Sequence, residues 1–471
     1  SRDDGVTWDD ITPPDMPEGG TVNQIDMSVH DPGRATVAVY KYREQDFHPY
    51  IYQTNDYGQT WSLLTDGTNG IPADHFVRTV REDPNRKGLL FAGTEFGLYV
   101  SFDDGAHWQP FQLNLPITPV TDMIFKDGDL VVATQGRAFW VLDNMTALSQ
   151  LTEDVMSAPA HLFKPRTSYR SGGNSPEIQF YIADGTSGNA TLEIANSAGE
   201  VLSTRTGRVQ AGGGAAAQFG GGGRGGGGGR GGRGGFGGFG GGGDRLVART
   251  GMNSVGWSGD WPSLYTVPQG IVQWGGSRGG GPAAAPGNYT VTLTIGDWSQ
   301  SQTLEYLPDP RISGVTQAQY EEQVRFAREV GAEAKRLYDE LEQLRSVKEQ
   351  ATQIGQQLAD AGYGNEAMQA ARDLSRKLEA VEGELTQLQG SAGQDALNFP
   401  GRLDNQLNAL YGEVSGGNPP IQGGAYERWE DIKGELQPHV DAIHAIYDSD
   451  LAAFNELVGE YGMRVVMRRQ Q

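Results

Sequence analysis

The sequence predicts a multidomain chain: β-propeller blades that are all-β and incomplete on this chain, then an immunoglobulin- or fibronectin-III-like β-sandwich, then a C-terminal antiparallel α-helical bundle. Three observations lead to this prediction. A motif of the form S/T-x-D-x-G-x-x-W occurs three times within the first 108 residues, short alternating strands follow it, and a helical hydrophobic period then continues towards the C-terminus. We place the three regions at residues 1–150, 158–310 and 315–471.

The repeated motif begins at residues 1, 54 and 101. This spacing is close to the ~40–50 residues of one four-stranded propeller blade. In each copy we expect the aspartate to accept backbone N–H bonds in a tight turn, the glycine to adopt a positive φ, and the tryptophan to pack between adjacent blades. These roles are structural and need no catalysis. The residues concerned are Ser1, Asp3, Gly5, Trp8, Thr54, Asp56, Gly58, Trp61, Ser101, Asp103, Gly105 and Trp108.

The two ends of the propeller region differ from its middle. Residues 129–143 have strand character but no motif, which is typical of a terminal blade. The first motif begins at residue 1, so we expect residue 1 to be an internal point of a longer precursor, reached by truncation or processing. The preceding propeller half, on the same precursor or on a separate chain, is then a partner of this region and would carry any export signal.

Residues 158–310 contain about seven short alternating strands with turn signals between them, which favours a β-sandwich. A Gly/Arg-rich insert at residues 212–243 interrupts it, and we expect this insert to be a disordered surface loop because its composition cannot bury a core. RGG-type segments can contact nucleic acid. However, the formal net charge of −22 disfavours nucleic acid and anionic membrane surfaces as partners.

From residue 315 the hydrophobic period becomes helical. The pattern predicts a first helix to about Leu358, a second from Gly364 or Asn365, a third over 403–414, and a fourth over 429–458 with Pro438 as a kink. Four amphipathic helices joined by loops favour an antiparallel bundle whose first two helices project as a hairpin. This bundle is a candidate surface for docking or oligomerisation.

Composition excludes several classes of site. There are no cysteines, so disulfides and thiolate–metal sites are absent, and the 7 histidines are dispersed without a metal-binding spacing. The glycine tract matches neither a P-loop nor a dinucleotide-binding turn. No apolar stretch reaches the ~18 residues of a membrane span. We therefore expect no cofactor, no metal and no membrane span.

A glycosidase requires two carboxylates that face one sugar ring. The acids outside the motifs in the propeller region are Asp46, Asp74, Glu82 and Glu95, and each is equally compatible with a solvated surface charge. A sialidase-like site would also need three converging arginines, but no spacing groups Arg34, Arg43, Arg78, Arg81, Arg86 and Arg137 in this way. The catalytic residues are therefore unassigned.

Binding has a clearer candidate. Five aromatic residues lie between residues 39 and 53, namely Tyr40, Tyr42, Phe47, Tyr50 and Tyr52. If they are exposed, they suit stacking on sugars or contact with a peptide. The alternative, which the alternation favours, is that these tyrosines are core residues.

Several segments beyond the three motifs carry a family resemblance. They are TQGRAFWVLD at 134–143, APGNYTV at 285–291 and LNFPGRL at 397–403. Together with the motifs they resemble the C-terminal half of the BNR/Asp-box repeat, sortilin-like "glycosyl hydrolase" family of large exported bacterial proteins. The resemblance implies a secreted, periplasmic or cell-surface location. The enzymatic name of that family rests on the Asp boxes, which sialidases, xyloglucanases and sortilin-type receptors share, so it does not establish an activity.

Two functions follow. The first is an exported, non-catalytic β-propeller protein that binds or scaffolds a protein or glycan partner. The alternative is a glycoside hydrolase, sialidase- or xyloglucanase-like, whose active site lies mainly in the missing N-terminal blades.

Overall fold

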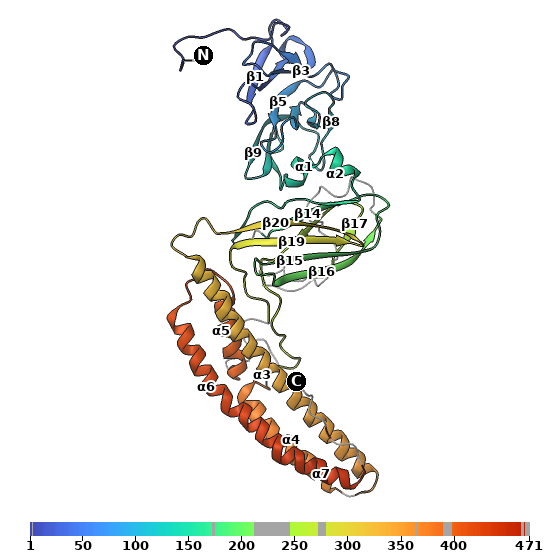
Figure 1. The fold of residues 1–471 in the computed structure, drawn as a ribbon, viewed down its shortest axis with the longest axis vertical. Coiled ribbons are helices and arrows are strands. Elements are labelled where there is room, and N and C mark those ends of the chain that lie inside the picture. The colour runs from blue at the N-terminus through green and yellow to red at the C-terminus, as the bar shows by residue number, and fades with distance from the viewer. Residues whose placement is uncertain are drawn as a thin grey trace.

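The computed structural model describes residues 1, 3–171, 175–211, 245–271, 279–363, 365–389, 398–462 and 466. Three regions follow one another along its long axis: a set of small sheets, a β-sandwich and a group of long helices (Figure 1). The fold is thus mostly β-sheet with a C-terminal helical region. The Gly/Arg-rich insert at 212–243 lies outside the described residues.

The N-terminal region consists of three antiparallel sheets whose strands follow the order of the chain or its reverse, as in propeller blades. The first sheet contains β1 (Thr21–Met27), β2 (Ala35–Lys41), β3 (Asp46–Thr54) and β4 (Ser62–Leu63), with the short 3-10 helix η1 (Tyr42–Glu44) between β2 and β3. The second contains β5 (Val77–Glu82), β6 (Leu90–Thr94), β7 (Gly97–Ser101) and β8 (Gln109–Pro110). The third contains β9 (Val120–Lys126), β10 (Asp129–Thr134) and β11 (Phe139–Leu142).

Two apolar cores hold these sheets together. One joins the first and second sheets and includes Ala38, Ile51, Val80 and Trp108. The other joins the second and third sheets and includes Phe91, Leu98, Met123 and Leu130. Because the second sheet has a neighbour on both faces, every residue of β6 is buried. This explains why β6 reads as a continuous apolar run and not as an alternating one.

The outer faces of the two end sheets are open. On β1 the exposed apolar side chains are Val22, Ile25 and Met27, and on the third sheet they are Ile124, Phe139 and Val141. Val131 pairs with both Ile124 and Val141, so these side chains form a continuous row across the sheet. Apolar rows of this kind are usually covered by another layer.

Two sheets form the central sandwich, with the short helices α1 (Thr146–Gln150) and α2 (Glu153–Ser157) leading into it. In the described residues, one sheet has the order β12 (Ala160–Leu162), β14 (Glu177–Ile182), β18 (Gly251–Gly256). The other has the order β13 (Ser168–Arg170), β20 (Trp298–Pro308), β19 (Gly287–Ile295), β15 (Asn189–Ala195), β16 (Val201–Gln210), β17 (Ala248–Arg249). Apolar residues from both sheets share one core, while β13–β20 and β16–β17 pair in parallel. The immunoglobulin- or fibronectin-III-like class stays a prediction.

The helical region is organised along one long helix. It comprises α3 (Gln317–Asp360), α4 (Glu366–Leu385), α5 (Leu403–Ser415), α6 (Gly423–Ile446), the π-helical turn η4 (Tyr447–Leu451) and α7 (Ala452–Glu460). A capping box between Thr316 and Gln319 begins α3. With 44 residues, α3 is about 66 Å long at ~1.5 Å per residue. None of the helices among the described residues is long and apolar enough to span a membrane.

The arrangement differs from the predicted bundle with a projecting hairpin. Gly331 packs against Tyr411 of α5, whereas Gly355, further along α3, packs against Ala371 of α4. Helix α6 contacts both α4 and α5, and α7 contacts α4 (Figure 1). The first two helices do not project alone, because the apolar stripe of α4 also needs cover from α6 and α7. Pro438 lies within α6, and the helical irregularity falls at η4.

The sandwich is joined to the helices by an inserted loop. Tyr265 precedes β19 in the chain but belongs to the helical core, where its hydroxyl donates to Asn408 Oδ1 at 2.7 Å. Leu264 packs at Gly331 of α3, where a Cβ would come within 2.5 Å of the leucine side chain. Arg170 of β13 donates to Gln323 of α3 at 2.8 Å. The two regions therefore share a packed and hydrogen-bonded junction.

Candidate functional site

The second motif forms the turn between β3 and β4, and the third forms the turn between β7 and β8. In the second copy, Thr54 Oγ1 donates to Asp56 Oδ1 at 2.9 Å and accepts from the Gly58 N–H at 2.8 Å. Asp56 Oδ1 also accepts from the Thr60 N–H at 2.8 Å. The same set recurs at Ser1, Asp3, Gly5 and Thr7 and at Ser101, Asp103, Gly105 and His107.

These bonds leave the motif carboxylates satisfied within their own turns. The glycines have positive φ values of 90°, 84° and 86° at Gly5, Gly58 and Gly105, so only glycine fits there without strain. Hydrogen bonds from the Thr60 side chain and backbone lower the pKa of Asp56, and those from Thr7 lower the pKa of Asp3. A carboxylate held ionised in this way is a poor proton donor, which favours a turn-forming role over an acid catalyst.

The pH dependence of stability tests this role. Because the pKa of Asp56 is lowered on folding, its ionised form stabilises the fold above the ordinary value of 3.8, and this contribution is lost as the pH falls through the lowered value. We expect Asp56→Asn to lower the melting temperature at pH 7 and the gap to the parent chain to close towards pH 3. Thermal unfolding followed by circular dichroism between these pH values measures the gap, with the exposed Asp74→Asn as the matched control. A gap that is the same at both ends would contradict the prediction.

The three motif tryptophans have different environments. Trp108 is 5% exposed in the core between the first and second sheets, and its Nε1 donates to Leu64 O at 3.2 Å. Trp61 is half-buried and donates to Ile11 O at 2.8 Å. Trp8 is 78% exposed, so the expectation that it packs between blades is wrong for this chain. In the other two copies the segment that the tryptophan contacts comes from earlier in the sequence.

A polar network on the inner strands was not predicted from the sequence. Arg81 of β5 pairs with Asp26 of β1 at 2.9 Å and with Asp122 of β9 at 3.2 Å, and its Nε donates to Met123 O at 2.6 Å. Gln24 of β1 accepts from the Val80 N–H at 2.9 Å. The sequence does show polar residues within the innermost strand of each sheet. Whether these side chains contact one another depends on how the sheets stack, which the sequence pattern does not specify. Asp26 and Asp122 form a carboxylate pair around one guanidinium group.

The acids considered from the sequence are dispersed among separate partners. Glu82 is 8% exposed and pairs with Arg34 at 3.0 Å. Glu95 pairs with Arg78 at 2.6 Å, and Asp46 accepts from the Tyr50 hydroxyl at 2.9 Å. The side chain of Asp74 is 81% exposed. Within the described ranges, no group of three or more His, Asp or Glu side chains could hold a metal ion.

An aromatic cluster lies where the first and second sheets meet. Its centre is Phe76, which stacks on Tyr42 with 4.6 Å between ring centroids and lies 6.3 Å from Phe47. Beside it, His75 packs on Phe96 at 4.4 Å. Phe47 is 46% and Phe96 44% exposed, whereas Phe76 is 4% exposed and supports them. We call Tyr42, Phe47, His75, Phe76 and Phe96 the aromatic face.

Arginine side chains border the aromatic face. The Arg78 guanidinium lies 5.0 Å from the Phe76 ring and 5.5 Å from the Tyr42 ring, and Glu95 fixes it there. The exposed Arg43 lies 5.9 Å from the rings of Tyr40 and Tyr42. The combination offers flat apolar rings and guanidinium donors on one surface of an otherwise acidic chain.

The aromatic residues predicted for binding are divided by the structure. Tyr42 and Phe47 belong to the aromatic face, but Tyr40 and Tyr52 are only 8% and 0% exposed, so their prediction as binding residues is wrong. Alternate strand positions share a face, and Val37, Val39 and Tyr52 together fill a small core. Tyr50 is half-buried, and burial together with Asp46 raises its pKa to about 12. The sequence missed Phe76 and Phe96 because they lie far from residues 39–53.

The aromatic face and the motif turns occupy opposite ends of the sheets. The aromatic residues come from the β2–β3 connection and the start of β3, from the β6–β7 connection, and from the entry to β5. The motifs fill the β3–β4 and β7–β8 turns. Since consecutive strands are antiparallel, consecutive turns such as β2–β3 and β3–β4 lie at opposite ends of the sheet. Motif residues therefore do not contribute to the aromatic face.

Together the fold and this face define a mostly β chain with propeller-like sheets and a candidate binding surface. No family model matches the chain, and no curated protein matches it. Among solved structures, it is similar to the GH74 enzyme of Niastella koreensis, with 13% identity, a TM-score of 0.23, and coverage of 40% of this chain and 28% of that one. An ancestral GH74 enzyme shows 14% identity, a TM-score of 0.20, and coverage of 63% and 34%.

A third similar structure is the extracellular domain of a hybrid two component system from B. thetaiotaomicron, with 9% identity, a TM-score of 0.16, and coverage of 61% of this chain and 36% of that one. The chain thus spans about a third of the length of these structures. Likeness at this level carries no argument about function, which therefore rests on the geometry of this chain.

Proposed function

We propose that the chain is the C-terminal half of an exported, non-catalytic β-propeller protein that binds a glycan or protein partner through the aromatic face. A secreted, periplasmic or cell-surface location accords with the resemblance to the BNR/Asp-box, sortilin-like family. In this proposal the motif residues are structural, with the Ser/Thr, Asp and Gly positions forming turns, and the sandwich is immunoglobulin- or fibronectin-III-like.

The observation that carries the proposal is the construction of the aromatic face. Phe47 and Phe96 are large apolar side chains left nearly half exposed, and both stand on buried or hydrogen-bonded neighbours. His75 Nδ1 is 2.9 Å from the Tyr99 hydroxyl, which orients the ring beneath Phe96. Rigid rings bordered by guanidinium groups suit the C–H face of a sugar ring or an aromatic side chain of a protein.

A partner for the sheets themselves is part of the proposal. The open apolar rows on β1 and on the third sheet suit further blades of the same kind, supplied by a preceding propeller half. The helical region is a second candidate contact surface between copies of the chain. Its apolar stripes are largely covered by one another, so the propeller end is the stronger candidate.

Removal of the exposed rings tests the binding function. We expect Phe47→Ala/Phe96→Ala to weaken binding of a soluble polysaccharide, or of a protein partner in cell-envelope extract, by at least about tenfold because the rings anchor the surface. Affinity electrophoresis in xyloglucan, glucomannan and hyaluronan gels and a pull-down from the extract measure the two cases. Tyr57→Asn, which changes a 60% exposed aromatic residue in the second motif turn, is the matched control.

Loss of binding in the double variant but not in the control is the expected outcome. Binding that is unchanged in the double variant, or absent in the parent chain with its preceding half included, would rule out the aromatic face as the site.

A second candidate function is glycoside hydrolysis. The specific observation in its favour is the pair Asp26 and Asp122, two carboxylates on inner strands that contact the same guanidinium group. Against it, both pair with Arg81, and the N–H groups of Glu82 and Met123 donate to them. The test is whether the complete propeller releases reducing sugar from polysaccharides or sialosides. If it does, and if Asp26→Asn and Asp122→Asn abolish the release, the function is catalysis and not binding.

A further inference from the structure

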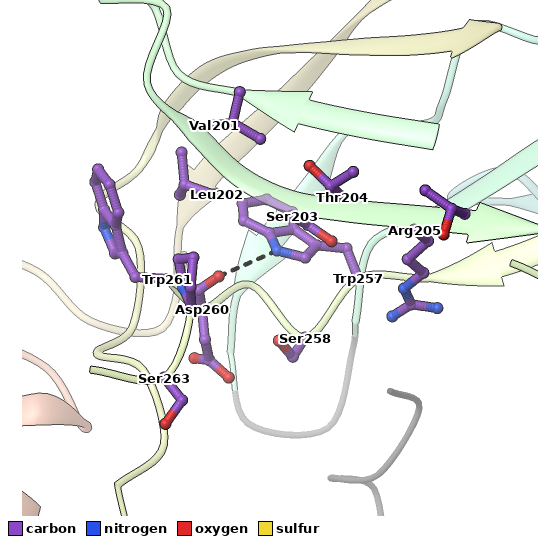
Figure 2. A pocket seen from close by; sticks show the side chains of 12 residues that line it. Val201, Leu202, Ser203, Thr204, Arg205, Trp257, Ser258, Asp260, Trp261 and Ser263 are labelled. Carbon is purple, nitrogen blue, oxygen red and sulfur yellow. Dashed lines mark hydrogen bonds between the residues drawn. The ribbon is translucent and has the colours of Figure 1, made fainter. Parts of the chain in front are cut away.

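The β-sandwich contains a cavity that the aromatic face does not share. It lies between β16 and the segment 257–263 (Figure 2), has a volume of about 520 Å³ and is partly open to solvent. Small-molecule sites in proteins typically measure about 300–1,000 Å³. Its lining is mostly polar, with Ser203, Thr204, Arg205, Ser258 and Asp260 on its walls.

One wall is formed by polar side chains at interior strand positions. Ser203 pairs with Ile194 and Arg205 pairs with Leu192 in the β15–β16 ladder. Ile194 and Leu192 are each 2% exposed and point into the sandwich core. Directly paired residues share a face of the sheet, so Ser203 and Arg205 also point inwards. A hydroxyl and a guanidinium therefore stand where a sandwich normally places apolar side chains, and the space beside them is unfilled.

The opposite wall is held by a buried tryptophan. Trp257 is 2% exposed and packs on Tyr289 and Tyr306 with centroid distances of 5.0 and 5.7 Å. Its Nε1 donates to the Asp260 carbonyl oxygen at 3.2 Å, the dashed contact in Figure 2. This bond fixes the short segment from 257 to 260, so that the side chains of Ser258 and Asp260 are presented on the cavity wall.

The polar groups of the cavity retain bonding capacity. Arg205 Nη2 donates to Gly256 O at 2.8 Å, which orients the guanidinium and leaves its other N–H groups for a ligand. Across the described ranges, no ion pair joins Asp260 to a basic side chain. Burial raises the pKa of its carboxyl group, opposed by a Ser258 hydrogen bond and by the charge of Arg170. Trp261 completes the rim, with the Arg328 guanidinium 4.3 Å from its ring.

We propose that this cavity binds a neutral oligosaccharide. Sugar hydroxyls both donate and accept, and the cavity offers an acceptor in Asp260, a donor in Arg205 and hydroxyls in Ser203 and Ser258. An anionic ligand would meet the Asp260 carboxylate, and a cationic ligand would meet the Arg205 guanidinium. The indole of Trp261 supplies the apolar surface that the C–H face of a pyranose ring contacts.

Titration of the full chain with defined hexasaccharides tests the proposal. The probes are cellohexaose, xylohexaose, mannohexaose and maltohexaose, followed by calorimetry and by tryptophan fluorescence. We expect at least one to bind with a dissociation constant below about 1 mM. We expect Asp260→Asn and Arg205→Gln each to weaken that binding by at least about tenfold, and Ser203→Ala to weaken it without changing the melting temperature.

Two controls separate this site from the aromatic face. Asp297→Asn alters an exposed acid in the β19–β20 turn of the same sandwich and should leave binding unchanged. The titrations are repeated in the Phe47→Ala/Phe96→Ala variant, which removes any binding at the aromatic face, so that failure of the proposed function and failure of this cavity are distinguishable. The proposal is overturned if none of the four hexasaccharides binds, or if binding survives all three cavity substitutions. Loss of binding in the aromatic-face variant alone would also overturn it.

Discussion

Replacement of Arg34 by methionine is expected to lower the free energy of unfolding of the N-terminal sheets by about 3–5 kcal/mol. The side chain of Arg34 is 2% exposed and lies 3.0 Å from Glu82, whose side chain is 4% exposed. It also donates to Asp104 at 3.0 Å and to Asn55 at 3.2 Å. Methionine matches the length of the stem but leaves the Glu82 carboxylate buried without its cation, and that uncompensated charge is the physical reason for the large effect.

Urea-induced unfolding followed by circular dichroism measures this difference. Lys87→Met is the matched control, because Lys87 and Asp31 form a solvent-exposed pair with side chains 51% and 38% exposed. Exposed pairs contribute about 0–1 kcal/mol, so the control should be nearly neutral. The double variant Arg34→Met/Glu82→Gln should recover part of the loss. Equal effects of Arg34→Met and Lys87→Met would show that the buried network does not hold the sheets together.

The second large effect is expected at Trp108. Trp108→Ala should cost about 3–5 kcal/mol, because it removes the largest side chain in the core between the first and second sheets. Trp8→Ala should change stability by less than about 0.5 kcal/mol, because Trp8 is 78% exposed. The two residues occupy the same motif position, so any difference between the two variants reports the packing of the side chain and not its place in the motif. The same urea-induced unfolding measures both variants. Similar losses of unfolding free energy at both positions would contradict a stabilising role for Trp108 in the core between the first and second sheets.

Most of the fold that could be predicted from the sequence follows from local patterns. The motif turns are closed by bonds between residues two to four positions apart, so the sequence alone specifies their geometry. The helices of the C-terminal region follow from 3–4 spacing in the same way. Their mutual arrangement does not, because the stripe of α4 is equally compatible with a projecting hairpin and with cover from α6 and α7. Contacts between segments distant in the sequence determine which of the two arrangements forms.

The candidate site was predictable only in part, for the same reason. Tyr42 and Phe47 lie within the aromatic stretch that the sequence singled out, but Phe76 and Phe96 join them only because two sheets lie side by side. Tyr40 and Tyr52 show the opposite error, since their alternation was compatible with exposure or with a core. In the sandwich, Arg205 reads as an ordinary strand cation until the β15–β16 register shows that it points inwards.

The length of α3 has a mechanical consequence. Near its N-terminus, Gln323 and Arg328 contact Arg170 and Glu200 of the sandwich at 2.8 and 3.4 Å, while α4 and α7 lie towards its far end. A rod of about 66 Å anchored at its base acts as a lever, and a rotation of about 5° at the junction displaces its tip by about 6 Å. Arg328 also lies over Trp261 on the rim of the cavity. A small rotation at the junction would therefore appear at the opposite end of the molecule as a movement as wide as a helical turn.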